Sequence, residues 1–219
     1  MIRPGEEWGR PTTAAADLDI AGGDADLAAA VGARPGLLVR FRPDPTSDLA
    51  GAVGLDPAGG SDAPRGIELP LDLLRLDDGR TATNMVVLGT PPDTLGRFAR
   101  RFGANVRVDE KPVFHGPCTT IVVATGQFRR GLDLVPRGHP GDGRAEVQVY
   151  AVRAGERAAL RARLATGTHV PHPRITQRSG ARIDVTVDRR VALELDGRSA
   201  AGIDFLQIRV DPEAYRLLV

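Results

Sequence analysis

Short apolar runs alternate with helix-like segments in the first quarter of the chain. Residues 18–21 form an apolar run that ends at two glycines, and residues 26–31 follow with an acidic first position and an apolar helical pattern. Residues 37–41 repeat the apolar run, and residues 46–53 begin with three polar residues that are typical of a helix cap. Two consecutive strand–turn–helix units predict part of a parallel β-sheet.

Residues after position 66 show the alternation of apolar and polar positions that is typical of half-buried strands. The alternation is clearest in residues 147–149 and 183–187, and it predicts an antiparallel sheet with one face on the core. Residues 93–102 and 156–164 instead space their apolar side chains as a helix does. Strands are expected at residues 67–76, 85–88, 119–124, 132–135, 146–152, 182–187, 191–195 and 205–210.

Two segments lack an apolar pattern and divide the chain. Residues 1–16 contain prolines and little apolar periodicity, which predicts a leader. Residues 56–66 are rich in glycine, alanine and proline, which predicts a domain junction. The sequence therefore predicts an incomplete α/β domain over residues 17–66 and an antiparallel β domain over residues 67–219.

The charge balance narrows the classes of partner. The 219 residues include 29 Lys and Arg against 28 Asp and Glu, for a formal net charge of +1. No overall field draws such a chain to nucleic acid or to an anionic membrane, so binding to either would need a local patch. The arginines are scattered without an aromatic stacking platform, so nucleic-acid binding is not expected.

Cysteine use and hydropathy indicate the compartment. Cys118 is the sole cysteine, which excludes an intrachain disulfide and a cysteine-based zinc cluster. No run approaches the roughly 20 apolar residues of a membrane span, and residues 1–8 lack the apolar core of a signal peptide. The expected location is the cytoplasm, with attachment at the membrane periphery as the open alternative.

Several short motifs resemble, in their order and spacing, those of the bacterial diacylglycerol kinase and lipid kinase family. Residues 22–26 (GGDAD) resemble the GGDGT phosphate loop of that family, and residues 46–50 (TSDLA) resemble its GTGND motif followed by Leu-Ala. Residues 196–198 (DGR) resemble its late Asp-Gly-Glu motif, and residues 136–143 resemble a segment that ends in Asp-Asp-Gly. Further similar segments are residues 84–89, 124–126 and 212–219.

The resemblance extends over residues 17–219 and implies a fold and an activity. The family couples a Rossmann-like α/β nucleotide domain to a β-sandwich domain, so a truncated α/β remnant followed by an antiparallel β-sandwich is expected here. Family members begin with a further β-α-β stretch, and this chain has at most sixteen residues in that place. The family transfers phosphate from ATP to a lipid hydroxyl.

The resemblance assigns nucleotide binding to residues whose backbone N–H groups face the phosphates. They are Gly22, Gly23, Asp24, Thr46 and Asp48. Three neighbours depart from the family pattern. Ala25 replaces a glycine, which costs about 1–2 kcal/mol where φ is positive. Asp26 brings a carboxylate toward phosphate oxygens, and Pro45 has no N–H to donate. Asp24 and Asp26 equally fit plain helix caps, so ATP is expected only if the chain is an active kinase.

Arg198 is the departure with the clearest chemical consequence. It stands where the family has the glutamate that is proposed to take the proton of the lipid hydroxyl. A guanidinium keeps its proton at physiological pH and has no acceptor, so Arg198 cannot act as that base. It could instead clamp an anionic headgroup or a phosphate with its planar fork. The alternative is a solvent-exposed arginine beside a two-residue Asp-Gly turn.

The magnesium site that the resemblance implies corresponds to residues 139–144. Its ligands here would be the carboxylate of Asp142 and the backbone carbonyls of His139 and Arg144, since Mg²⁺ prefers oxygen ligands. The alternative is a plain turn at Asp142 and Gly143.

The leading hypothesis is a lipid-kinase-like protein that has lost phosphotransfer and binds a lipid, an anionic small molecule or a protein. The first alternative is an active ATP-dependent lipid kinase that a second subunit completes or that uses another base, for which Asp24 and Glu194 are the candidate carboxylates. The second alternative is an interaction protein that pairs exposed edge strands with a second copy of itself or with a protein partner.

Overall fold

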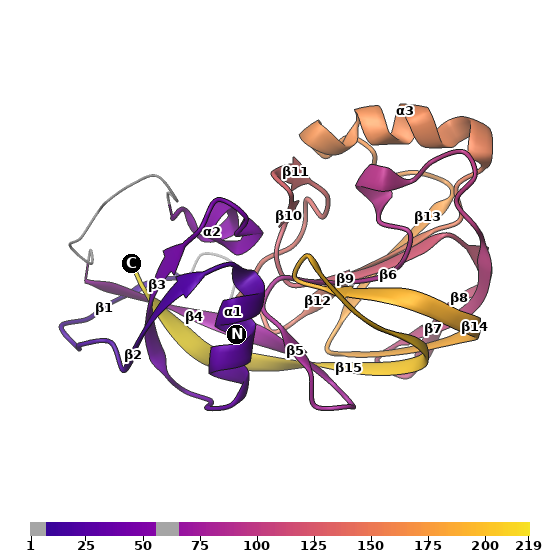
Figure 1. The fold of residues 1–219 in the computed structure, drawn as a ribbon. Coiled ribbons are helices and arrows are strands. Elements are labelled where there is room, and N and C mark those ends of the chain that lie inside the picture. Colours follow the sequence, from indigo (N-terminus) through magenta and orange to yellow (C-terminus); the bar gives the residue numbers. More distant parts are fainter. Residues whose placement is uncertain (1–7, 56–65) are drawn as a thin grey trace.

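The structure is a computed structural model that describes residues 8–55 and 66–219. Two lobes lie side by side and share long strands that run through both (Figure 1). The N-terminal lobe carries two of the α-helices, and the C-terminal lobe consists mostly of antiparallel strands. Residues 1–7 of the predicted leader and residues 56–65 of the predicted junction lie outside the described residues.

Two strand–helix units form the N-terminal lobe, as predicted. Strand β2 (Leu18–Gly22) leads into α1 (Asp24–Gly32), and β3 (Leu38–Pro43) leads toward α2 (Asp48–Val53). Strands β2 and β3 pair in parallel, so the predicted parallel arrangement is confirmed. Both helices share one apolar core with these strands, because each presents an apolar face to the sheet.

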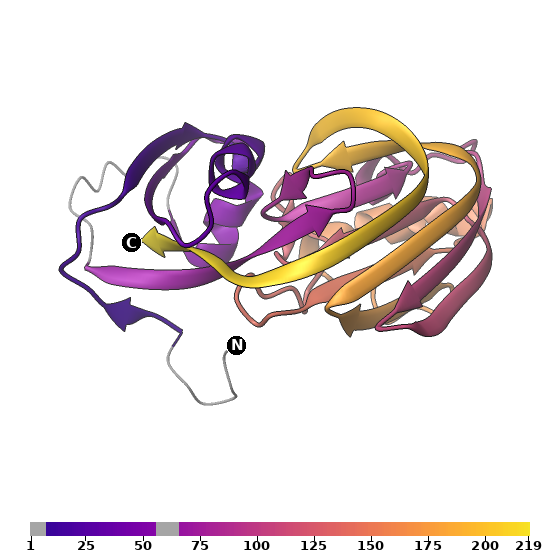
Figure 2. The same cartoon turned by 90° about the horizontal axis from the view of Figure 1, so that it is seen from below.

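Strands β4 (Ile67–Leu76) and β15 (Arg198–Leu218) extend through both lobes (Figure 2). The two strands pair with each other in antiparallel register. The end of β15 also pairs in parallel with β3, where Arg216 lies opposite Leu38. The last strand of the chain therefore completes the sheet of the N-terminal lobe.

The C-terminal lobe is an antiparallel β-sandwich. In the described part of the chain, thirteen strands from both lobes belong to one continuous sheet, which curls around the apolar core of the C-terminal lobe. Helix α3 (Arg157–Ala162) and its flanking 3-10 turns lie against a further core on the outside of this sheet (Figure 1). The expected fold class, an α/β lobe followed by an antiparallel β lobe, is confirmed. None of the helices in the described ranges is both long and apolar enough to cross a membrane.

The smaller elements complete this arrangement. The N-terminal lobe adds β1 (Arg10–Pro11), which pairs with β4. The remaining elements are β5 (Thr81–Ala82), β6 (Met85–Gly89), η1 (Pro92–Thr94), β7 (Phe102–Val108), β8 (Lys111–Cys118), β9 (Thr120–Ala124), β10 (Phe128–Arg129), β11 (Leu132–Asp133), β12 (Ala145–Tyr150), η2 (Ala154–Glu156), η3 (Leu164–Thr166), β13 (Ile175–Gly180) and β14 (Arg182–Leu195).

The predicted helix over residues 93–102 is wrong. The chain makes only the 3-10 turn η1 there, continues as a loop, and enters strand β7 at Phe102. Leu95 and Phe102 are buried, but Phe98 is 91% exposed. The three side chains therefore share no buried face, and their helical spacing carries no structural meaning.

Strands β7, β8 and β13 were not predicted from the sequence. In addition, the two strands predicted at residues 182–187 and 191–195 form a single strand. Strand β14 runs through residues 182–187 and 191–195, with register shifts against β15 between them. The three intervening residues are exposed and polar, so the apolar pattern stops although the strand continues. The two predicted strands are therefore the two halves of one strand with a bulge between them.

Candidate functional site

A cleft of about 740 Å³ lies where the two lobes meet. Four chain segments line it: the turn from β2 into α1, the residues before α2, the tip of the β10–β11 hairpin, and the turn between β14 and β15. The lining includes five residues that the sequence analysis selected, namely Gly23, Asp24, Thr46, Asp48 and Arg198. The structure therefore brings four of the five predicted nucleotide positions and the predicted base position to one place, and Gly22 is not part of the lining.

The turn from β2 into α1 requires its first glycine. Gly22 has φ +137°, and a Cβ there would lie 2.5 Å from a carboxylate oxygen of Asp26. The same carboxylate accepts a hydrogen bond from the backbone N–H of Gly23 at 3.0 Å. Ala25 lies inside α1 and does not have a positive φ, so the backbone strain considered for it does not arise.

Asp24 connects the two helices of the N-terminal lobe. Its side chain is 4% exposed and accepts hydrogen bonds from Ser47 Oγ at 2.5 Å and from the backbone N–H groups of Asp48 and Leu49 at 3.0 Å each. Burial raises the pKa of Asp24 to about 7, and the nearby charge of Asp196 adds to the rise. Asp24 therefore caps α2 from the side of α1, with a carboxyl group that is easily protonated.

Asp26 and Arg198, two of the residues that depart from the family pattern, face each other. The Arg198 guanidinium donates to Asp26 Oδ2 at 2.7 Å, and this bond joins α1 to the β14–β15 turn. The hydrogen bond from Arg198, with that from Gly23, lowers the pKa of Asp26. The Arg198 side chain is 61% exposed and the Asp26 side chain 39% exposed, so the pair lies in water at the edge of the cleft.

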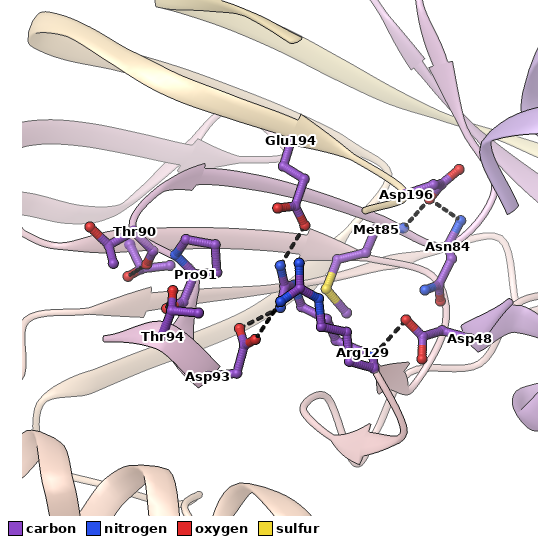
Figure 3. A network of polar contacts seen from close by, with 12 residues as sticks. Asp48, Asn84, Met85, Thr90, Pro91, Asp93, Thr94, Arg129, Glu194 and Asp196 are labelled. Carbon is purple, nitrogen blue, oxygen red and sulfur yellow. Dashed lines mark hydrogen bonds and ion pairs between the residues drawn. The ribbon is translucent and has the colours of Figure 1, made fainter. Parts of the chain in front are cut away.

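Asp48 and Thr46 also bond to the protein itself. The two carboxylate oxygens of Asp48 accept the backbone N–H groups of Arg130 at 2.7 Å and Gly131 at 2.9 Å, at the tip of the β10–β11 hairpin. Figure 3 shows Asp48 pointing toward this segment. The backbone N–H of Thr46 donates to Asp44 at 2.8 Å, and its hydroxyl donates to the same oxygen at 2.5 Å. Asp48 therefore holds the hairpin across the cleft.

Asp196 fixes the turn that carries Arg198. Asp196 and Gly197 have φ of +47° and +79°, as a two-residue hairpin turn requires. The Asp196 carboxylate accepts the backbone N–H groups of Thr83, Asn84 and Met85 at 2.7, 3.0 and 2.8 Å. Figure 3 shows Asp196 beside Asn84 and Met85. Burial raises the pKa of Asp196 although these hydrogen bonds oppose the rise.

A buried ion-pair network lies beside the cleft (Figure 3). The Arg129 side chain is 4% exposed, lies 2.6 Å from Glu194, and also pairs with Asp93. Glu194, one of the candidate bases, therefore neutralises Arg129 and does not line the cleft. No local sequence pattern indicates this network, because Arg129 is 36 and 65 positions away from its two partners.

The cleft does not fit a triphosphate in the way that the resemblance implies. Asp26 already accepts the N–H of Gly23 that would face a phosphate, and Pro45 offers no N–H. Asp24 and Asp26 also place two carboxyl groups in the first turn of α1, where the helix dipole would otherwise favour an anion. Each of these features disfavours binding of the ATP phosphates by the backbone N–H groups of this helix end.

The residues of the predicted magnesium site lie in the loop between β11 and β12 and do not line the cleft. Asp142 accepts the backbone N–H of Arg144 at 2.9 Å, and the ring of His139 lies 4.6 Å from that of Trp8. Burial raises the pKa of Asp142. Burial also raises the pKa of Asp72 to about 6, with a smaller contribution from Asp142. The charge of Asp142 thus disfavours the charge of Asp72, and a hard cation, which prefers oxygen ligands, would relieve this effect.

The family comparison covers most of the C-terminal lobe. Residues 95–219, more than half of the chain, match the family described as the YegS C-terminal NAD kinase beta sandwich-like domain. No curated protein sequence matches the chain.

Three solved structures are similar at low sequence identity. A diacylglycerol kinase from Bacillus anthracis str. Sterne is 15% identical with a TM-score of 0.76, over 92% of this chain and 77% of that one. A yeast NADH kinase complexed with NADH is 12% identical with a TM-score of 0.51, over 93% of this chain and 62% of that one. An NAD kinase from Archaeoglobus fulgidus in complex with ATP is 14% identical with a TM-score of 0.47, over 93% and 78%. The first two similarities show a shared fold.

Proposed function

The chain belongs to the family of the YegS C-terminal NAD kinase beta sandwich-like domain, and from this premise we propose that its cleft binds a phosphate-bearing ligand without phosphorylating a lipid. The ligand is an anionic small molecule or the headgroup of a lipid. The proposal rests on Arg198, which lines the cleft at the position where the resemblance places a glutamate base. A guanidinium cannot accept a proton from a hydroxyl, but its fork fits a phosphate.

The aspartates of the cleft are already bound to the protein itself. Asp24, Asp48 and Asp196 line it, and each accepts hydrogen bonds from the protein on both carboxylate oxygens. A general base needs an oxygen within hydrogen-bond reach of the proton that it removes. Among the described residues that line the cleft, no carboxylate has an oxygen without a hydrogen bond from the protein.

Arg198 is available to a ligand because its present partner is easily displaced. An ion pair as exposed as Arg198 with Asp26 contributes about 1 kcal/mol or less. A phosphate carries more charge than a carboxylate and accepts two parallel N–H bonds from a guanidinium. Arg130 also lines the cleft with a 61% exposed side chain, so a second guanidinium is at hand.

Thermal denaturation with added sn-glycerol 3-phosphate or inorganic phosphate tests this proposal. Wild-type protein should melt at a higher temperature with sn-glycerol 3-phosphate, and Arg198→Gln should lose that rise. Arg182→Gln, which removes an exposed arginine at the other end of β14, should keep it. An equal rise in all three proteins would contradict the role of Arg198.

The alternative function is an ATP-dependent lipid kinase completed by a second polypeptide. Two observations favour it. Asp24 lines the cleft with a pKa of about 7, which suits a general base near neutral pH. Strand β2 pairs with β3 alone among the described strands, so its other edge can accept a strand. A saturable rise of the melting temperature with Mg-ATP supports this alternative, and a flat response with and without lipid argues against it.

Light scattering after size-exclusion chromatography tests the pairing of strand edges. A homodimer that forms through β2 should dissociate when Ala21 in that strand is replaced by proline, because proline removes a donor from the strand. If the protein is a monomer at micromolar concentration, the edge of β2 does not pair with a second copy of the chain, and only a different protein could pair with it.

We also assign Mg²⁺ to Asp142 and to the backbone carbonyls of His139 and Arg144, with Asp72 beside them. The raised pKa of Asp72, to which the charge of Asp142 contributes, supports this assignment. In this place the ion would hold the loop between β11 and β12 against β4, where Gly143 already donates to Asp72 at 2.6 Å.

A further inference from the structure

An exposed phenylalanine lies on the C-terminal lobe in the loop between η1 and β7. Phe98 is 91% exposed, whereas Leu95 on one side of it and Phe102 on the other are buried. A single exposed apolar side chain is ordinary on a protein surface, so the meaning of Phe98 depends on what surrounds it. None of these residues lines the cleft.

The protein holds this loop in place with a buried arginine. Arg157 of α3 is 3% exposed, and its Nη1 donates to the carbonyl oxygens of Gly96 and Arg97 at 2.9 Å each and of Ala99 at 3.2 Å. Three carbonyls around one guanidinium fix the path of the loop backbone. The exposure of Phe98 is therefore built into the structure.

The same place carries a strong local excess of positive charge. Residues 95–101 and 153–166, which these hydrogen bonds join, hold seven arginines and one acidic residue, although the whole chain has a net charge of only +1. The acidic residue, Glu156, lies 3.3 Å from Arg174 and is thereby neutralised. Five of the arginines are exposed, namely Arg97, Arg100, Arg101, Arg153 and Arg163. We call these two segments the Phe98 surface.

The outer side of α3 adds small side chains between the arginines. Ala158, Ala159 and Ala162 are exposed and do not project beyond the backbone as arginine and phenylalanine do. Such a face can lie close to a flat layer of headgroups. The Phe98 surface therefore combines positive charge, one apolar side chain and a low profile.

We propose that the Phe98 surface binds an anionic phospholipid bilayer, with Phe98 between the headgroups and the exposed arginines on their phosphates. Aromatic side chains and basic residues together suit the interface of an anionic membrane. Single-stranded nucleic acid would use the charge but is bound by several aromatic side chains that stack its bases, and the two segments contain no other aromatic residue. Duplex DNA would bind the arginines through its phosphates and would leave Phe98 without a role. This binding is independent of the ligand proposed for the cleft.

Flotation of the full chain with vesicles tests the proposal. The protein should float with vesicles of phosphatidylglycerol and phosphatidylcholine and stay behind with phosphatidylcholine alone, and raising the salt concentration should weaken the binding. Phe98→Ser should weaken it about tenfold, as expected for one apolar side chain that leaves water. Arg97→Gln and Arg100→Gln should each weaken it about fivefold.

Two controls separate insertion of Phe98 from general stickiness. Phe205→Ser removes a 46% exposed phenylalanine of β15 outside the Phe98 surface and should bind vesicles as wild type does. Phe98→Trp should show a blue shift of its emission on phosphatidylglycerol vesicles, after subtraction of the wild-type signal from Trp8. Circular dichroism confirms that each variant is folded.

Three results would overturn the proposal. The first is no binding of folded wild-type protein to phosphatidylglycerol vesicles. The second is equal loss of binding in Phe98→Ser and Phe205→Ser. The third is binding to duplex DNA as tight as to the vesicles at the same salt concentration and unaffected by Phe98→Ser.

Discussion

Replacing Asp24 with asparagine removes a buried charge and keeps its contacts. The carboxylate accepts Ser47 Oγ on one oxygen and the backbone N–H groups of Asp48 and Leu49 on the other. In Asp24→Asn the amide oxygen can accept the two N–H groups, and the NH₂ group can donate to Ser47 Oγ. The substitution therefore isolates the cost of the charge.

The magnitude follows from the pKa of this group. Burial raises the pKa of Asp24 from an ordinary 3.8 to about 7, so between these pH values the folded protein holds a proton that the unfolded chain has released. The free energy that the protonated Asp24 contributes to stability is fully present below about pH 4, and it is lost as the pH rises toward 7. The difference between the two pKa values corresponds to about 4 kcal/mol.

Urea denaturation of both proteins between pH 4 and pH 8 measures this effect. The free energy of unfolding of wild type should fall relative to that of Asp24→Asn as the pH rises from 4 to 8. The difference between the two proteins should change by about 4 kcal/mol in favour of Asp24→Asn. Asp204→Asn, at an exposed position of β15, controls for a general change of charge. If the difference between Asp24→Asn and wild type stays constant with pH, the carboxyl group titrates normally and the reasoning fails.

Three further substitutions test other parts of the account. Arg129→Met should lower the free energy of unfolding by about 3–5 kcal/mol, because it leaves two carboxylates beside the cleft without their partner, whereas Arg178→Met on the surface should change it little. Asp48→Ala should cost about 1–2 kcal/mol and speed amide hydrogen exchange at the two hairpin N–H groups that it holds. Asp142→Asn should abolish a rise of the melting temperature with Mg²⁺, and an unchanged rise would remove the ion from this loop.

The sequence predicted the N-terminal units well because their signals are local. An apolar run and the polar start of a helix lie within a few positions of each other at residues 18–31 and again at residues 37–53. In the first unit Gly22, at a positive φ, also marks the turn between strand and helix. Each such unit determines its own strand, turn and helix. Because strands β2 and β3 of these two units are parallel neighbours, the turns that follow them line the same cleft.

The features that the sequence did not predict depend on contacts between distant parts of the chain. Asp26 and Arg198 are 172 positions apart, and nothing near either residue indicates that they pair. Asp72 lies in an apolar strand, and its acceptance of an N–H from Gly143, 71 positions away, has no local signal. The helix expected at residues 93–102 is absent for a similar reason, because three carbonyl oxygens of that loop accept hydrogen bonds from Arg157 of α3, about 60 positions further along the chain.

Transfer of radiolabelled phosphate from ATP to diacylglycerol in detergent micelles tests the central claim most directly. The full chain should give no product with Mg²⁺ under conditions in which an active diacylglycerol kinase does, because Arg198 cannot accept the proton of the lipid hydroxyl. Product that depends on the wild-type chain and disappears in Asp24→Asn would contradict the claim and make Asp24 the base.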